Sequence, residues 1–205
     1  MTIPRPLDRP TSEQIAAMPS YAALPPARVH LLETPSQLEF AERELRAAIH
    51  VGFDTESKPL FKAGEPQTGP HVIQFATRDD AFIVQTATPG TQAFLRAMIE
   101  SDAIVKVGFG LASDRPQIQR SLGLRLGKSI DLSYVVRQLG FRDAVGLKTA
   151  VAVVLGRRLS KSKKATTSNW ASPILSPQQL QYAANDAHAS LMVYAALSER
   201  QVRFS

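Results

Sequence analysis

The sequence has no cysteine among its 205 residues and no long hydrophobic run. The first absence excludes disulfide frameworks, cysteine-based zinc sites and thiol chemistry. It also fits a reducing compartment, so we expect a cytoplasmic protein. The second absence excludes a membrane-spanning helix, which needs about 20 apolar residues in a row. The N-terminus also lacks the apolar segment of a secretory signal. The length suits one domain, or one domain with an arm, and an ordinary core.

The excess of positive charge is small overall but concentrated in one stretch. Lysine and arginine number 24 against 18 aspartate and glutamate residues, a net charge of +6. Residues 137–164 alone hold eight basic side chains and the single acid Asp143. Such a stretch is either a solvated loop or a strip that contacts phosphates and makes binding sensitive to salt. Charge alone does not choose between the two.

Six of the fourteen prolines lie in residues 1–26, which therefore cannot carry sheet ladders. We expect this segment to be an arm on the domain or a partly mobile tail. It can hold at most a short helix, which Thr11 would cap and Pro19 would end. Residues 27–205 are then expected to form one globular domain.

Hydropathy patterns in the domain predict strands alternating with helices. The strands are expected at residues 29–32, 49–56, 72–77, 81–84, 103–107 and 129–132. The helices are expected at 36–48 with a capping box of Ser36 and Glu39, 91–100, from about 113 with Pro116 in the first turn, 132–139, 147–155 and from 176. This order predicts an α/β fold with a mixed sheet of five or six strands flanked by helices.

Asp54 and Glu56 stand two residues apart on the expected strand 49–56, so their side chains project from the same face. Apolar residues take the alternate positions, which is typical of a half-buried strand. Two carboxylates at its end would repel each other unless a cation bridges them. The alternative is that residues 54–56 already belong to a solvated turn before Lys58-Pro59.

The last expected helix carries another acid in an unusual place. Tyr182 and Asp186 are four residues apart, so they are neighbours on one helix face, and small alanine residues surround Asp186. Small side chains let another surface or a ligand come close, and a buried aspartate without a partner is costly. The alternative is an exposed Asp186 beside a surface tyrosine.

A further acid follows a strand and two glycines. In residues 106–114, Lys-Val-Gly-Phe-Gly-Leu-Ala-Ser-Asp, the strand ends in glycines and Asp114 falls in the first turn of the next helix. An acid there is either a ligand or a group that simply complements the helix dipole, which is the commoner case.

Taken together, the order of these motifs resembles the DEDD superfamily of 3′–5′ exonucleases, which have a ribonuclease-H-like fold. The motifs are Val51-Gly-Phe-Asp-Thr-Glu-Ser57, then residues 106–114, then Leu180-Gln-Tyr-Ala-Ala-Asn-Asp-Ala187. The resemblance is nearest to the Werner-type and ribonuclease D branch. Gln181 stands where one subclass has histidine and Tyr182 where the other has tyrosine, so the chain looks like the tyrosine subclass.

The resemblance implies a metal-dependent enzyme that hydrolyses nucleic acid from the 3′ end to 5′-mononucleotides. Asp54, Glu56, Asp114 and Asp186 would bind two divalent metal ions. Magnesium or manganese is expected, because an all-carboxylate set is a hard oxygen site. Asp54 would bridge both ions, and Tyr182 would orient the attacking water.

The partner implied is single-stranded or 3′-ended nucleic acid, DNA or RNA. Its phosphates would be contacted, without sequence readout, by the basic residues Lys148, Arg157, Arg158, Lys161, Lys163 and Lys164. Leu60 or Phe61 would stack on terminal bases, although Phe61 suits core packing equally well. Trp170 is expected in the core.

Three other interpretations stay open. The chain could be a non-catalytic nucleic-acid-binding module of the same fold, a ribonuclease D-like enzyme that processes RNA 3′ ends, or a metallohydrolase of small phosphate esters. All four acids and the tyrosine are present, which favours an active enzyme over a module that has lost its activity.

Overall fold

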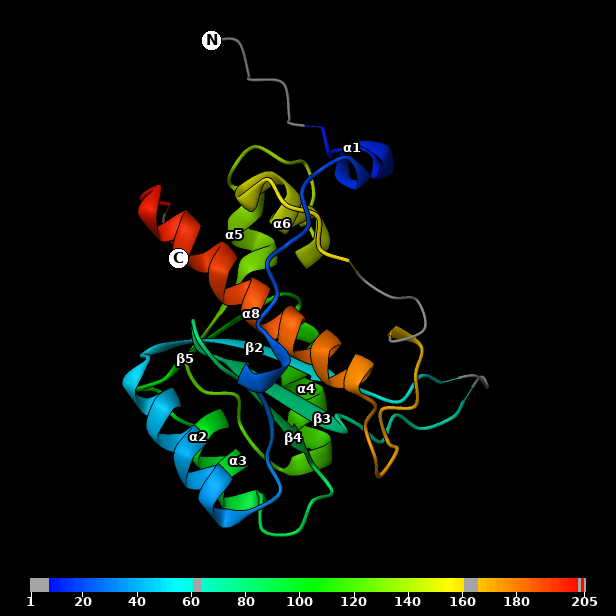
Figure 1. The fold of residues 1–205 in the computed structure, drawn as a ribbon, viewed down its shortest axis with the longest axis vertical. Helices are drawn as coiled ribbons and strands as arrows, with labels where there is room; N and C mark the ends of the chain where they lie inside the picture. Colours follow the sequence, from blue (N-terminus) through cyan, green and yellow to red (C-terminus); the bar gives the residue numbers. More distant parts are fainter. Residues whose placement is uncertain (1–7, 61–63, 161–165, 203, 205) are drawn as a thin grey trace.

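The computed structural model describes residues 8–60, 64–160, 166–202 and 204. At its centre lies a six-stranded sheet in the order β1-β4-β3-β2-β5-β6 (Figure 1). Its strands are β1 (Val29–Leu31), β2 (His50–Glu56), β3 (Val72–Ala76), β4 (Ala81–Gln85), β5 (Val105–Gly108) and β6 (Ser129–Asp131). β2 pairs antiparallel with β3 and parallel with β5, so the sheet is mixed, as predicted.

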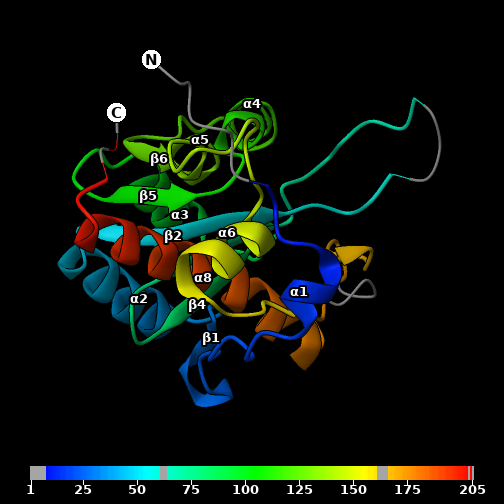
Figure 2. The same cartoon turned by 90° about the horizontal axis from the view of Figure 1, so that it is seen from above.

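Helices cover both faces of the sheet (Figures 1 and 2). On one face pack α2 (Pro35–Ala47), α3 (Gln92–Ile99) and α4 (Leu111–Leu122). The long helix α8 (Pro177–Glu199) crosses the other face, where α5 (Leu132–Arg137) and α6 (Leu147–Leu155) join it in a second core. None of the described helices combines the length and hydropathy needed to cross a lipid bilayer.

Side-chain alternation along β2 assigns its residues to these two layers. Val51 and Phe53 are fully buried in the core beneath α2, α3 and α4. Gly52 lies against the backbone of α8, because a Cβ at this position would overlap the carbonyl oxygen of Ala187. Asp54 shares the face of Gly52, so it projects toward α8.

The start of α2 differs from the sequence prediction. The expected capping box of Ser36 and Glu39 is wrong, because Thr34 caps the helix instead. Thr34 Oγ1 accepts from the backbone N–H of Gln37, and Gln37 Oε1 accepts from the backbone N–H of Thr34 at 2.9 Å. Pro35 then occupies the first turn, where its missing N–H costs nothing.

Helix α4 also begins earlier than predicted. Gly110 takes a left-handed conformation, with φ of 76°, between the end of β5 and Leu111, the first helical residue. A side chain would be strained there, which explains the glycine. Pro116 therefore lies inside the helix rather than in its first turn. Asp114 remains in the first turn, as predicted.

The described part of the arm lies against the domain. Thr11 caps a short helix, α1 (Ser12–Ala16), as the sequence predicts. A single 3-10 turn, η1 (Pro26–Arg28), then leads into β1. Ile15 and Leu24 are buried, so the arm contributes two apolar side chains to the packed molecule.

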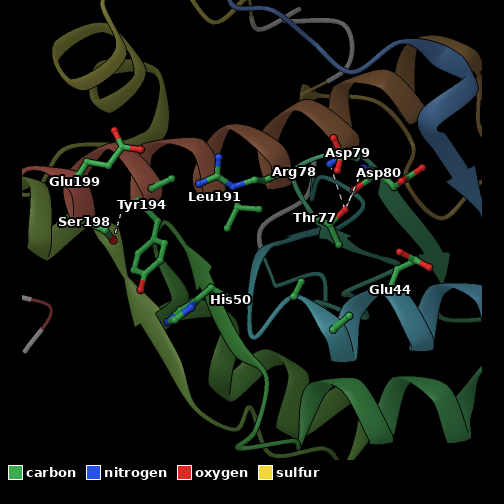
Figure 3. Close-up of a pocket in the computed structure, with 13 residues that line it drawn as sticks. Glu44, His50, Thr77, Arg78, Asp79, Asp80, Leu191, Tyr194, Ser198 and Glu199 are labelled. Atoms are coloured by element: carbon green, nitrogen blue, oxygen red, sulfur yellow. Dashed lines mark hydrogen bonds between the residues drawn. The ribbon is translucent and has the colours of Figure 1, made fainter.

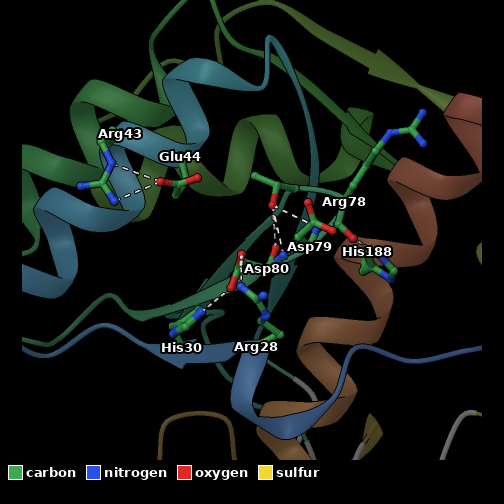
Figure 4. A network of polar contacts seen from close by, with 9 residues as sticks. Arg28, His30, Arg43, Glu44, Arg78, Asp79, Asp80 and His188 are labelled. Atoms are coloured by element: carbon green, nitrogen blue, oxygen red, sulfur yellow. Dashed lines mark hydrogen bonds and ion pairs between the residues drawn. The ribbon is translucent and has the colours of Figure 1, made fainter.

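A polar network joins the arm, α8 and the β3–β4 turn, and Figure 4 shows the part of it around that turn. The ring of His188 accepts from the hydroxyl of Tyr21 at Nδ1, at 2.7 Å, and donates from Nε2 to the carbonyl oxygen of Arg78, at 3.0 Å. Burial lowers the pKa of His188, which keeps this ring neutral. In the same turn, the buried Asp80 lies 2.7 Å from Nε2 of His30.

Candidate active site

Three of the predicted acids meet at the end of β2. Carboxylate oxygens of Asp54, Glu56 and Asp186 all lie within 4.8 Å of one another. Asp54 and Glu56 come from one face of β2, and Asp186 comes from α8, which packs over that face. Asp186 is buried, whereas Asp54 and Glu56 are partly exposed, so the cluster can be reached from one side.

The close approach of α8 to β2 depends on small residues. Ala183, Ala184 and Ala187 of α8 are fully buried against the sheet. Gly52 adds no side chain at the crossing point, and the carbonyl of Ala187 occupies the space that a Cβ would need. The helix backbone thus lies near the strand, and the short side chain of Asp186 can reach the strand acids.

Asp114, in the first turn of α4, contacts the strand β2 at the residue between the two strand acids. The hydroxyl of Thr55, the residue between Asp54 and Glu56, donates to Asp114 Oδ1 at 3.0 Å. Burial raises the pKa of the Asp114 carboxyl to about 6, partly offset by the hydrogen bond from Thr55. Asp114 is not among the three residues whose oxygens lie within 4.8 Å of each other. Its contact is with Thr55, whose side chain alternation along β2 directs to the face opposite Asp54 and Glu56.

Tyr182 lies one helical turn before Asp186 on α8 and is buried. Its hydroxyl lies 3.2 Å from Thr166 Oγ1, and its ring packs at 5.9 Å from the ring of Trp170. Trp170 is fully buried, so its predicted place in the core is confirmed. The phenol is therefore held on the same helix face as Asp186.

The chemistry of this donor set suits a hard cation. Carboxylates this close repel one another, and burial of Asp186 strengthens the repulsion. A divalent cation would relieve the repulsion, and oxygen ligands without cysteine or histidine favour Mg²⁺ or Mn²⁺ over softer metals. Asp54, Glu56 and Asp186 are thus able to hold a metal ion.

The predicted nucleic-acid contacts are only partly described. Lys148 and Arg157 are exposed, and so is Leu60, just after β2. Arg158 is engaged by the arm, because its guanidinium donates to Ala16 O and to Ser20 Oγ, each at 3.1 Å. The arm therefore occupies two of the five N–H donors of this guanidinium. The remaining predicted contacts lie outside the described residues: Phe61, Lys161, Lys163 and Lys164.

An open groove of about 610 Å³ lies at the other end of β2 (Figure 3). Its lining includes His50, Arg78, Tyr194 and Glu199. His50 lines the groove and begins β2, and Asp54, the nearer strand acid, lies four residues further along, about 13 Å away at 3.3 Å per residue. The groove and the acidic cluster are therefore separate features.

Two polar residues near the cluster were not among the sequence-predicted site residues. Thr55 contacts Asp114, and its hydroxyl between two acids was a visible signal. Gln74 lies in the middle of β3, a strand whose five residues are all buried. A glutamine flanked on both sides by apolar residues of a buried strand is also a signal, because an amide is costly to bury.

Comparison with known proteins gives one family and several relatives. A family model described as a 3′–5′ exonuclease matches residues 29–201. The chain is 31% identical over 151 residues to the "Bifunctional 3'-5' exonuclease/ATP-dependent helicase WRN" of Mus musculus, an alignment that covers 72% of this chain. It is 29% identical over 160 residues to a "3'-5' exonuclease" of Arabidopsis thaliana, covering 77% of this chain.

These relatives are longer proteins, since the alignments cover only 11% and 56% of their own lengths. Among solved structures, the Aedes aegypti Nibbler EXO domain superposes with a TM-score of 0.71 at 25% identity. That superposition covers 87% of this chain and 93% of the other. The similarity therefore spans nearly the whole of that EXO domain.

Proposed function

Because the chain belongs to the 3′–5′ exonuclease family, we propose that it removes nucleotides one at a time from the 3′ end of nucleic acid as 5′-mononucleotides. The observation that carries this proposal is the convergence of Asp54, Glu56 and Asp186 within 4.8 Å. A non-catalytic module of the same fold would have no need to keep these acids together with Asp114 and Tyr182.

We propose that the acids hold two divalent ions, Mg²⁺ or Mn²⁺. Asp54, Glu56 and Asp186 would hold one, and Asp54 and Asp114 would hold the other. Such ions supply the positive charge that favours deprotonation of the attacking water and stabilises the leaving 3′ oxygen. The donor set supports this assignment, because all its members are carboxylates and three of them are already close together.

Tyr182 would act on the attacking water. Its ring is fixed by packing against Trp170, and its hydroxyl reaches Thr166. From this position the hydroxyl would hydrogen-bond to the water and orient it, while Asp186 one turn away binds metal. The exposed Lys148 and Arg157 would attract the phosphates of the substrate strand without reading its sequence.

The first test is digestion of an oligonucleotide labelled at its 5′ end. With Mg²⁺ or Mn²⁺ we expect a ladder of products shortened from the 3′ end. We expect EDTA to abolish it, because uncompensated carboxylates would repel the phosphate. Adding Mn²⁺ back should restore the ladder. A verified metal-free sample that digests at the full rate would contradict the mechanism. Matched DNA and RNA strands in the same assay identify the preferred polymer.

The second test is Tyr182→Phe. Removing the hydroxyl should lower kcat about 100-fold, at the lower end of what a positioned proton-transfer or orienting group supplies. KM should stay unchanged, because the ring that packs on Trp170 is retained. The matched control is Tyr194→Phe, three turns further along α8 and stacked on His50. Equal kinetics for both variants would exclude Tyr182 from the reaction.

A further inference from the structure

Gln74 is a fully buried polar side chain in an otherwise apolar strand, with 0% of its surface exposed. Neither Oε1 nor Nε2 has a hydrogen-bond partner among the described residues. A buried amide without a partner costs about 1–3 kcal/mol, which methionine or leucine at the same position would avoid. The cost indicates that the amide serves a purpose which apolar packing would not meet.

The strand register places Gln74 beside the acidic cluster. On the antiparallel strands β2 and β3, Gln74 lies directly opposite Asp54. Directly opposite residues project from the same face, with their Cβ atoms about 4.5–5.5 Å apart. α8 covers this face, since it contacts both β2 and β3 (Figure 1). The amide is therefore enclosed between the sheet and α8, next to the carboxylate of Asp54.

A second unpaired polar group lies in the same layer. Trp170 is fully buried, and its Nε1–H also has no partner among the described residues. Its ring belongs to the apolar cluster that contains Val72 and Ile83, and these are the strand neighbours of Gln74 on that face. A buried donor and a buried amide facing one layer are the setting in which proteins hold an ordered water.

We propose that Gln74 is a positioning residue for Asp54. Its Nε2–H donates through an ordered water to the Asp54 carboxylate, and its Oε1 faces the Nε1–H donor of Trp170. The amide thereby fixes the carboxylate in the orientation that metal binding needs. This inference rests on the proposed function for one point, that Asp54 is a metal ligand.

The test is Gln74→Met, which keeps the length of the side chain and removes its hydrogen bonds. Mutation of a residue that hydrogen-bonds to a metal ligand typically lowers metal affinity or activity about 10–100-fold. We therefore expect Mn²⁺ binding, measured by calorimetry, to weaken by about that factor. The melting temperature of the metal-free variant should stay level or rise, because a buried amide has been removed. If Gln74 had a purely structural role, Gln74→Met would change the melting temperature and leave the Mn²⁺ affinity unchanged.

Phe75→Leu is the matched control. Phe75 is the next residue of β3 and is equally buried, but its side chain packs in the core beneath α2 and α3. This variant should lower the melting temperature and leave Mn²⁺ affinity unchanged. If Phe75→Leu weakens Mn²⁺ binding as much as Gln74→Met does, the effect comes from stability and the inference is wrong.

The remaining outcomes separate this inference from the proposed function. If the wild-type chain binds Mn²⁺ and a folded Gln74→Met variant binds it equally well, only the role of Gln74 fails. If the wild-type chain binds no Mn²⁺, the metal assignment behind both proposals fails. Should Gln74→Met not fold, Trp170→Phe removes the other buried donor, and unchanged Mn²⁺ affinity in that variant overturns the inference.

Discussion

Asp186→Asn is expected to lower the exonuclease rate about 10³-fold, because the metal's charge stabilisation is worth several kcal/mol and each 1.36 kcal/mol is a factor of ten. Asparagine keeps the shape of the side chain but removes the charge from a carboxylate that is only 2% exposed. The fold should survive, since the three clustered carboxylates lose part of their mutual repulsion. The metal-free variant should melt at the same temperature as the wild type or higher.

Metal-induced stabilisation provides the second measurement. At a hundredfold excess over Kd, a ligand stabilises the folded state by about 2.7 kcal/mol, so Mn²⁺ should raise the melting temperature of the wild-type chain clearly. For Asp186→Asn this rise should be lost. Asp79→Asn is the control, because Asp79 is an exposed acid in the β3–β4 turn, at the other end of the sheet. An Asp186→Asn variant with normal turnover would remove Asp186 from the metal site.

The sequence predicted most of the fold because the apolar patterns are strong. Alternation in residues 49–56 predicted β2, and the run Val72-Ile-Gln-Phe-Ala76 predicted β3. The family match then confirmed the resemblance given by the motif order. The start of α2 was wrong because several residues near it are able to cap a helix, and the start of α4 because it follows the left-handed Gly110 and uses no side-chain cap. Thr34 rather than Ser36 makes the capping bonds, and only backbone geometry decides between them.

The candidate site was partly predictable for a similar reason. Asp54 and Glu56 share a strand face by periodicity alone, but the meeting of Asp186 with them depends on how α8 crosses the sheet. No local pattern specifies that crossing. Arg158 shows the converse case, since its charge suggested phosphate binding whereas its guanidinium is bonded to the arm. The charge pattern of neighbouring residues does not predict a long-range contact of this kind.

Gly52 determines how closely α8 crosses β2, so Gly52→Ala should impair both stability and activity. An added Cβ would overlap the carbonyl oxygen and carbon of Ala187, and it would lie 3.3 Å from Cβ of Leu191. The clash is mainly with backbone, so rotation of a side chain cannot relieve it and the helix must move. Overpacking of this kind costs about 1–3 kcal/mol, which a denaturant titration would measure.

The same displacement should separate Asp186 from the strand acids, because Asp186 precedes the clashing residue Ala187. A shift of about 1 Å in a catalytic group costs about 100-fold in rate, so we expect activity to fall by that factor even at temperatures where the variant is folded. Gly146→Ala is the comparison, since a Cβ there meets nothing within 4 Å. It should cost less than about 1 kcal/mol as a helix-cap change and leave turnover intact. If Gly52→Ala is destabilised yet retains full activity when folded, the meeting of the acids does not depend on the close crossing of α8 over β2.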